Sequence, residues 1–99
     1  MSVTMIRAQV KDESVAEVES AAKAMFAAIN EAQPPGVRYA SCKLGDDATF
    51  VVLLAVEDGI ENPLLALPAV REFQQNLPRW LAQPATPEPL TVVGSYNLF

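Results

Sequence analysis

The chain has 99 residues, of which 51% are apolar and 19% are charged, and its formal charge is −5. This length fits a single domain over residues 1–99, and the apolar content excludes a disordered chain. The acidic charge argues against nucleic acid or an anionic membrane as a partner. Neither a signal peptide nor an apolar stretch of membrane-spanning length is visible, so we expect a cytoplasmic protein.

The sequence contains no histidine and one cysteine, Cys42. Without histidine there can be no Ser-His-Asp or Cys-His nucleophile system, no imidazole metal site and no histidine-ligated haem. A single cysteine cannot form an internal disulfide, which fits a reducing compartment. We therefore expect neither a metal nor a cofactor.

The first predicted element is a strand over residues 3–10, where apolar and mixed side chains alternate. A helix of about five turns follows and ends before Pro34, because proline cannot continue it. Ser14 and Glu17 have the spacing of a capping box at the start of that helix. One apolar stripe with spacings of three and four residues runs along it, formed by Val15, Val18, Ala22, Met25 and Ile29.

Two further strands are predicted over residues 37–44 and 49–57, joined by the turn Gly45-Asp46-Asp47. The third strand of the chain is unusual, because residues 50–56 are apolar on both faces. A strand with one solvated face alternates between apolar and polar residues instead. We therefore expect both faces of this strand to be covered.

A short helical turn is predicted with Asn62 as its N-cap and Pro63 as its first residue, and Pro68 can open the next helix in the same way. One face of that helix carries the apolar residues Val70, Phe73, Leu77, Trp80 and Leu81. Pro78 lies inside this helix, so we expect a kink there. Pro84, Pro87 and Pro89 are then expected to form a stiff connection to a last strand over Leu90–Phe99.

The order β-α-β-β-α-β predicts an α+β fold, the ferredoxin-like antiparallel sheet with two helices on one face. The helices leave the other face of the sheet bare, and the chain has no residues left to cover it. A second copy is the simplest cover, since two-fold homodimers are the commonest oligomers. We expect a homodimer whose two sheets face each other as an α+β barrel.

This element order, the chain length, the third strand and the terminal Val92-Val93-Gly94-Ser95-Tyr96 segment resemble the dimeric α+β barrel superfamily. Within it, the chain looks most like the antibiotic-biosynthesis monooxygenase group. The superfamily includes cofactor-independent oxygenases of quinol-like substrates, haem-degrading enzymes, isomerases and members without known activity. The missing histidine removes the haem-degrading and His-Asp types, whereas a cofactor-free oxygenase needs only an apolar pocket and hydrogen-bonding groups.

Alternation predicts which side chains face the space between the two sheets. They are Met5, Arg7 and Gln9 on the first strand and Tyr39, Ser41 and Lys43 on the second. Arg7, Gln9, Tyr39 and Ser41 would then converge on one apolar-walled pocket for a small molecule. The alternative places Arg7 and Lys43 at the rim, paired with acids of the other subunit. Cys42 would face the helices with Ala40 and Leu44, as a buried and inert thiol.

In the oxygenases that the chain resembles, a helix tryptophan, a first-strand asparagine and a tyrosine or histidine contact the substrate. Trp80 matches the tryptophan by element, and Tyr39 or Tyr96 could supply the phenol. Arg7 and Gln9 lie on the first strand, which has no asparagine. The alternative for Trp80 is a core residue that packs with Phe73 and Leu77.

Two functions remain open. The first is a cofactor-independent monooxygenase-like protein that acts on a small aromatic, quinol-like molecule. Arg7, Tyr39 and Trp80 would then be catalytic, and Met5, Gln9, Ser41 and Tyr96 would bind the substrate. The second is a non-catalytic dimer that binds a small apolar ligand or another protein. One fold hosts many functions, so the fold alone does not decide between them.

Overall fold

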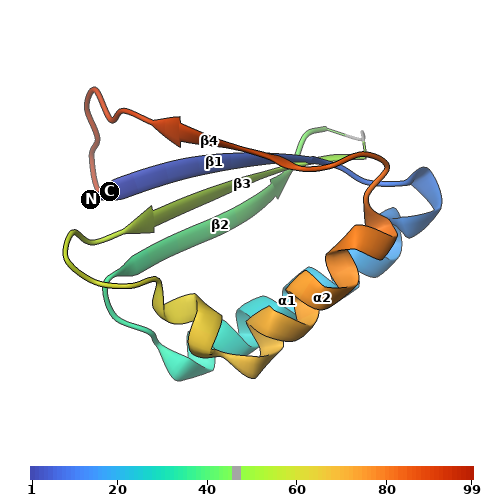
Figure 1. Cartoon of the computed structure of the whole chain (residues 1–99), viewed down its shortest axis with the longest axis horizontal. Coiled ribbons are helices and arrows are strands. Elements are labelled where there is room, and N and C mark those ends of the chain that lie inside the picture. Colours follow the sequence, from blue (N-terminus) through green and yellow to red (C-terminus); the bar gives the residue numbers. More distant parts are fainter. Residues whose placement is uncertain (46–47) are drawn as a thin grey trace.

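The computed structural model describes residues 1–45 and 48–99. A four-stranded antiparallel sheet forms one layer, and two helices cover one of its faces (Figure 1). The strands are β1 (Ser2–Gln9), β2 (Val37–Lys43), β3 (Thr49–Val56) and β4 (Thr86–Leu90), in the sheet order β2-β3-β1-β4. The helices are α1 (Val15–Ala32) and α2 (Pro68–Trp80), with short 3-10 helices at Asp12–Ser14 and Pro63–Ala66. The predicted ferredoxin-like order is therefore confirmed.

The apolar stripe of α1 faces the sheet as predicted, and Val18, Met25 and Ile29 are buried there. Ser14 precedes this helix at the N-cap position, but its side chain forms no capping hydrogen bond. Glu17 instead accepts hydrogen bonds from the end of α2, so the predicted capping box does not form. The helix ends at its predicted place, with Gln33 in the left-handed conformation before the two prolines.

Helix α2 runs without interruption through Pro78, and its residues Val70 and Trp80 are buried. Before it, the side chain of Asn62 accepts a hydrogen bond of 3.0 Å from the backbone of Leu64, which confirms the predicted cap. Phe73 packs against two groups of buried side chains, one around Trp80 and one around Met25. This ring therefore joins the two halves of the core.

The third strand has two apolar faces, as predicted. Phe50, Val52 and Leu54 lie on the face that the helices cover, and Val51 and Leu53 lie on the opposite face, called here the open face. Leu53 pairs with Met5 of β1 and with Ala40 of β2. The predicted turn residues Asp46 and Asp47 lie outside the described residues.

The predicted last strand is wrong in position. β4 is Thr86–Leu90, so Pro87 and Pro89 belong to a strand and not to a connection, and residues 91–99 form no strand. Alternate residues of an edge strand direct their N–H positions to the same side. Two prolines separated by one residue can thus both face away from β1, where no hydrogen bond is lost. Leu90 pairs with Val3, close to the start of β1, so the residues after Leu90 have almost no strand left to pair with.

The orientation predicted for the second strand is also wrong. Val37 and Tyr39 pack against the helices, while Ala40 and Cys42 are exposed on the open face. Both alternating sets of this strand contain apolar residues, so alternation alone gave no decisive signal. The orientation that buries the ring of Tyr39 removes more apolar surface from water than one that buries Ala40 and Cys42.

Candidate functional site

A cavity of about 100 Å³ lies between the sheet and the helices, and we call it the inner cavity. Most of its wall is apolar and comes from β1, β3, both helices and the segments next to β1 and β4: Ile6, Ala8, Val10, Val18, Met25, Phe50, Val52, Phe73, Leu77 and Ala85. Three polar side chains complete the wall, namely Tyr39, Ser41 and Gln74. An apolar enclosure with a few polar groups is typical of small-molecule sites.

Tyr39 is the ionisable residue of this wall. Its ring stacks on Phe26 of α1, with the ring centroids 5.1 Å apart. Burial raises the pKa of the Tyr39 phenol above its ordinary value of 10.0, because the phenolate would lose its hydration. At neutral pH the phenol is therefore protonated. Its hydroxyl can donate a hydrogen bond to a ligand but cannot act as a base.

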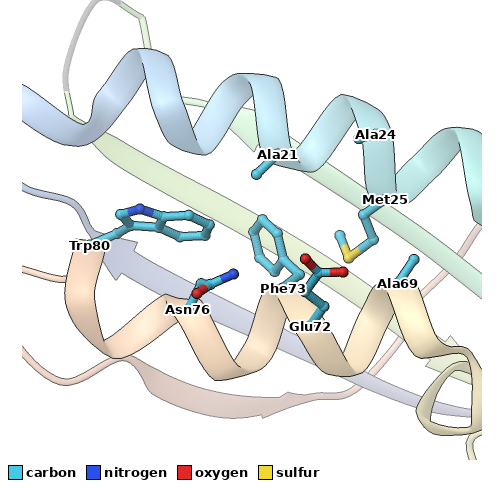
Figure 2. Close-up of a pocket in the computed structure, with 8 residues that line it drawn as sticks. All are labelled: Ala21, Ala24, Met25, Ala69, Glu72, Phe73, Asn76 and Trp80. Carbon is cyan, nitrogen blue, oxygen red and sulfur yellow. The ribbon is translucent and has the colours of Figure 1, made fainter.

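A second hollow of about 160 Å³ lies on the far side of Phe73, between the two helices, and we call it the helix groove (Figure 2). Ala21 and Ala24 of α1 and Ala69 of α2 leave room there. Glu72 and Asn76 provide its polar groups, and Trp80 lies at one end. Met25 and Phe73 line both the helix groove and the inner cavity. These two side chains therefore separate the two spaces.

Trp80 is a core residue with only 2% of its surface exposed. Its Nε1 donates a hydrogen bond of 3.0 Å to Glu17, and the guanidinium of Arg79 lies 5.4 Å from the centre of its ring. Its ring centroid is 5.4 Å from that of Phe73. The core alternative for Trp80 is thus confirmed, and the ring contributes to the helix groove but not to the inner cavity.

Arg7, Gln9 and Met5 lie on the open face. Arg7 is exposed and lines a shallow hollow together with Gln9 and Glu88. Gln9 accepts a hydrogen bond of 2.9 Å from the hydroxyl of Thr49. This hollow lies on the opposite side of the sheet from the inner cavity, because neighbouring residues of a strand point to opposite faces.

The predicted convergence of Arg7, Gln9, Tyr39 and Ser41 on one pocket is therefore wrong. Tyr39 and Ser41 face the helices, and Arg7 and Gln9 face away from them. Lys43 also lies on the helix side, where its Nζ is 2.7 Å from a carboxylate oxygen of Glu19 on α1.

The structure also differs from the predictions for Tyr96 and Cys42. Tyr96 lies in the C-terminal segment and is 89% exposed, away from the inner cavity wall. Cys42, predicted to be buried, is an exposed free thiol.

Sequence reasoning missed Gln74 as a site residue. It lies four residues after Val70 and three before Leu77, so it interrupts the apolar face of α2. A polar residue on an otherwise apolar helix face was the signal that could have identified it.

Within residues 1–45 and 48–99, no group of three or more Cys, Asp or Glu side chains is placed to hold a metal ion. No helix in the same part of the chain has both the length and the hydropathy required to cross a membrane.

No protein-family model matches the chain, and no curated protein matches it. Several solved structures do. A candidate antibiotic biosynthesis monooxygenase from Nitrosomonas europaea has a TM-score of 0.74 at 21% identity, over 95% of this chain and 100% of that one. A protein of unknown function from the same organism has a TM-score of 0.75 at 16% identity, over 96% and 91% of the two chains.

A candidate antibiotic biosynthesis monooxygenase from Caulobacter crescentus has a TM-score of 0.72 at 17% identity, over 94% of this chain and 90% of that one. All three likenesses extend over nearly the whole chain, and at these identities they establish a shared fold. The chain therefore has the fold of these candidate antibiotic biosynthesis monooxygenases.

Proposed function

We propose that this is a cofactor-independent monooxygenase-like protein that binds a small aromatic, quinol-like molecule in its inner cavity. The observation that carries the proposal is the wall of that cavity. It is apolar apart from Tyr39, Ser41 and Gln74. Apolar side chains accept an aromatic ring, and the three polar side chains can hold its oxygen atoms. The fold is shared with candidate monooxygenases, which is consistent with this function.

The proposed reaction needs no external reductant. A ring carbon that bears two hydrogens beside a carbonyl, as in the keto tautomer of a hydroquinone, reacts with dioxygen. One oxygen atom becomes a new carbonyl on that carbon, and the other leaves as water with the two hydrogens. The substrate itself supplies the electrons. The protein would favour the substrate anion that reacts with dioxygen, through hydrogen-bond donors placed at the developing charge.

Tyr39 is the residue that we assign to this role. Its phenol is protonated at neutral pH, as shown above, and it can donate to an enolate or phenolate oxygen. Ser41 and Gln74 offer further donors in the same wall. Arg7 had been expected to stabilise the anion, but it lies across the sheet and is not part of this site.

The alternative function, a non-catalytic dimeric module that binds a small ligand or another protein, is favoured by one observation. No carboxylate, lysine or arginine lines the inner cavity within the described part of the chain. The site thus lacks an evident general base, and a catalysed substrate must ionise readily by itself. A molecule that does not ionise would only be bound.

We also propose that the protein is a homodimer joined through the open face. The single chain exposes 6568 Å² of surface. A compact monomer of this length exposes roughly 5,500 Å², so the excess is roughly 1,000 Å². One partner of a standard protein interface buries about 800 Å². Apolar residues of the open face, such as Leu53, and of the C-terminal segment, such as the 99% exposed Val93, account for part of this surface.

Oxygen uptake with a panel of one-ring and two-ring hydroquinones tests the activity directly. Loss of one donor to a developing anion lowers turnover by about a hundredfold to a thousandfold. We therefore expect Tyr39→Phe to lower the rate by at least about tenfold. Tyr96→Phe removes the other phenol, which is 89% exposed, and serves as the matched control with an unchanged rate. Binding of these compounds without any oxygen uptake above buffer would support the non-catalytic alternative instead.

A further inference from the structure

The inner cavity alone is small for an aromatic ligand. Its volume is about 100 Å³, whereas a cavity known to hold one benzene ring measures about 150 Å³. A single ring would fit only if the wall moved, and two fused rings would not fit at all. A ligand can therefore bind only if some side chain of the wall moves.

One part of that wall separates the inner cavity from the helix groove. It consists of the side chains of Phe73 and Met25, which line both spaces. Figure 2 shows the Phe73 ring and the Met25 side chain lying next to each other between α1 and α2. The helix groove beyond them has a further 160 Å³. If Phe73 moved aside, the two spaces would become one.

Both side chains are suited to such a movement. Phe73 is half-buried, so its ring is not enclosed on all sides. A phenylalanine in a helix has two accessible χ1 orientations, which place its ring over different neighbours. Met25 is buried, but an unbranched thioether with three rotatable bonds adapts to a changed surrounding.

We propose that Phe73 is the residue that determines ligand size, and that the complete site is the inner cavity joined to the helix groove when this ring swings aside. The occupant is a neutral two-ring aromatic molecule. Its oxygen-bearing ring lies near Tyr39, Ser41 and Gln74, and its second ring lies in the helix groove. Glu72 lies at that groove, where its carboxylate disfavours an anionic ligand. This inference rests on the proposed function, because it extends the same cavity.

The test compares binding of 1-naphthol, with two rings, and phenol, with one, by isothermal titration calorimetry. The δ-methyl signal of Ile6, which lines only the inner cavity, shows in NMR spectra whether each compound reaches it. Phe73→Leu removes the separating ring. We expect it to tighten 1-naphthol binding at least about tenfold and phenol binding less than about threefold. Phe99→Leu is the matched control, since this half-buried ring lines neither space, and it should leave the ratio of the two affinities unchanged.

A second variant, Ala24→Leu, tests the same proposal even if Phe73→Leu fails to fold. Ala24 is exposed on α1 and lines the helix groove. Ala24→Leu keeps a good helix former and fills the groove from outside, so it should weaken 1-naphthol binding about tenfold and leave phenol binding unchanged. An affinity ratio that is unchanged in both variants, while both compounds still shift the Ile6 signal, would refute the role of Phe73 and leave the proposed function intact. If neither compound shifts that signal in any variant, the proposed function fails as well.

Discussion

Leu53→Asp tests the proposed dimer at the centre of the open face. Leu53 is half-buried in the single chain, between Met5 of β1 and Ala40 of β2, on the face opposite the helices. In the single chain a carboxylate at this position remains in contact with water. In a dimer that covers the face, the same carboxylate would be buried beside the uncharged Met5 and Ala40, and Arg38 is the cation that lines the same hollow.

The expected effect on dimer affinity is large. Each copy loses about 2 kcal/mol from the buried leucine side chain. Burial of each carboxylate adds a desolvation penalty of several kcal/mol. A symmetric dimer contains two copies of the substitution, so both the lost leucine burial and the carboxylate penalty count twice. The free energy of dimerisation should therefore weaken by more than about 8 kcal/mol. Since 1.4 kcal/mol is a factor of ten, the dissociation constant should rise by at least about five orders of magnitude.

Sedimentation velocity at micromolar concentration measures this effect. We expect the native protein to sediment as a dimer and Leu53→Asp as a folded monomer. Leu65→Asp is the matched control, because Leu65 is 51% exposed in the short helix before α2 and lies off the open face. That variant should remain a dimer. A native protein that is monomeric at these concentrations, or a Leu53→Asp variant that remains dimeric, would refute the reasoning.

Two further predictions concern contacts between elements. Trp80→Phe removes the hydrogen bond to Glu17 and part of a buried ring, so the free energy of unfolding in urea should fall by about 1–3 kcal/mol; an unchanged value would show that this contact contributes nothing. The hydrogen bond and charge of Lys43 hold the pKa of the Glu19 carboxyl below its ordinary value of 4.5. The Lys43–Glu19 ion pair therefore stabilises the fold fully above pH 4.5, and this stabilisation is lost as the pH falls through the lowered pKa of Glu19. In an NMR titration, Lys43→Met should raise the pKa of Glu19 towards 4.5, and no change would contradict the pairing.

The sequence predicted the structure correctly at places where only one periodic pattern of apolar residues was present. The stripe through Val18, Met25 and Ile29 is the only apolar stripe of its helix, and the structure buries these residues. The apolar run of residues 50–56 likewise predicted a strand, and the structure has β3 there. Local pattern and tertiary packing agree at these places, so the local pattern was enough.

Alternation failed where both faces of a strand could be buried. On β2 the choice between Tyr39 and Cys42 depended on the fit of one aromatic ring against Phe26 of α1, a contact between residues distant in sequence. That choice moved Tyr39 and Ser41 to the helix side and separated them from Arg7. The candidate site could be predicted as a set of residue types, but its location could not.

The central claim is that an aromatic molecule binds between the sheet and the helices. Ile6 and Met5 are neighbours on β1 that point to opposite faces, so their methyl groups report the two sides of the sheet. The decisive measurement is the set of intermolecular NOEs from a bound methylhydroquinone to these two methyl groups. The account predicts NOEs to Ile6 and none to Met5, with binding weakened in Tyr39→Phe. NOEs to Met5 alone would contradict it and place the ligand on the open face.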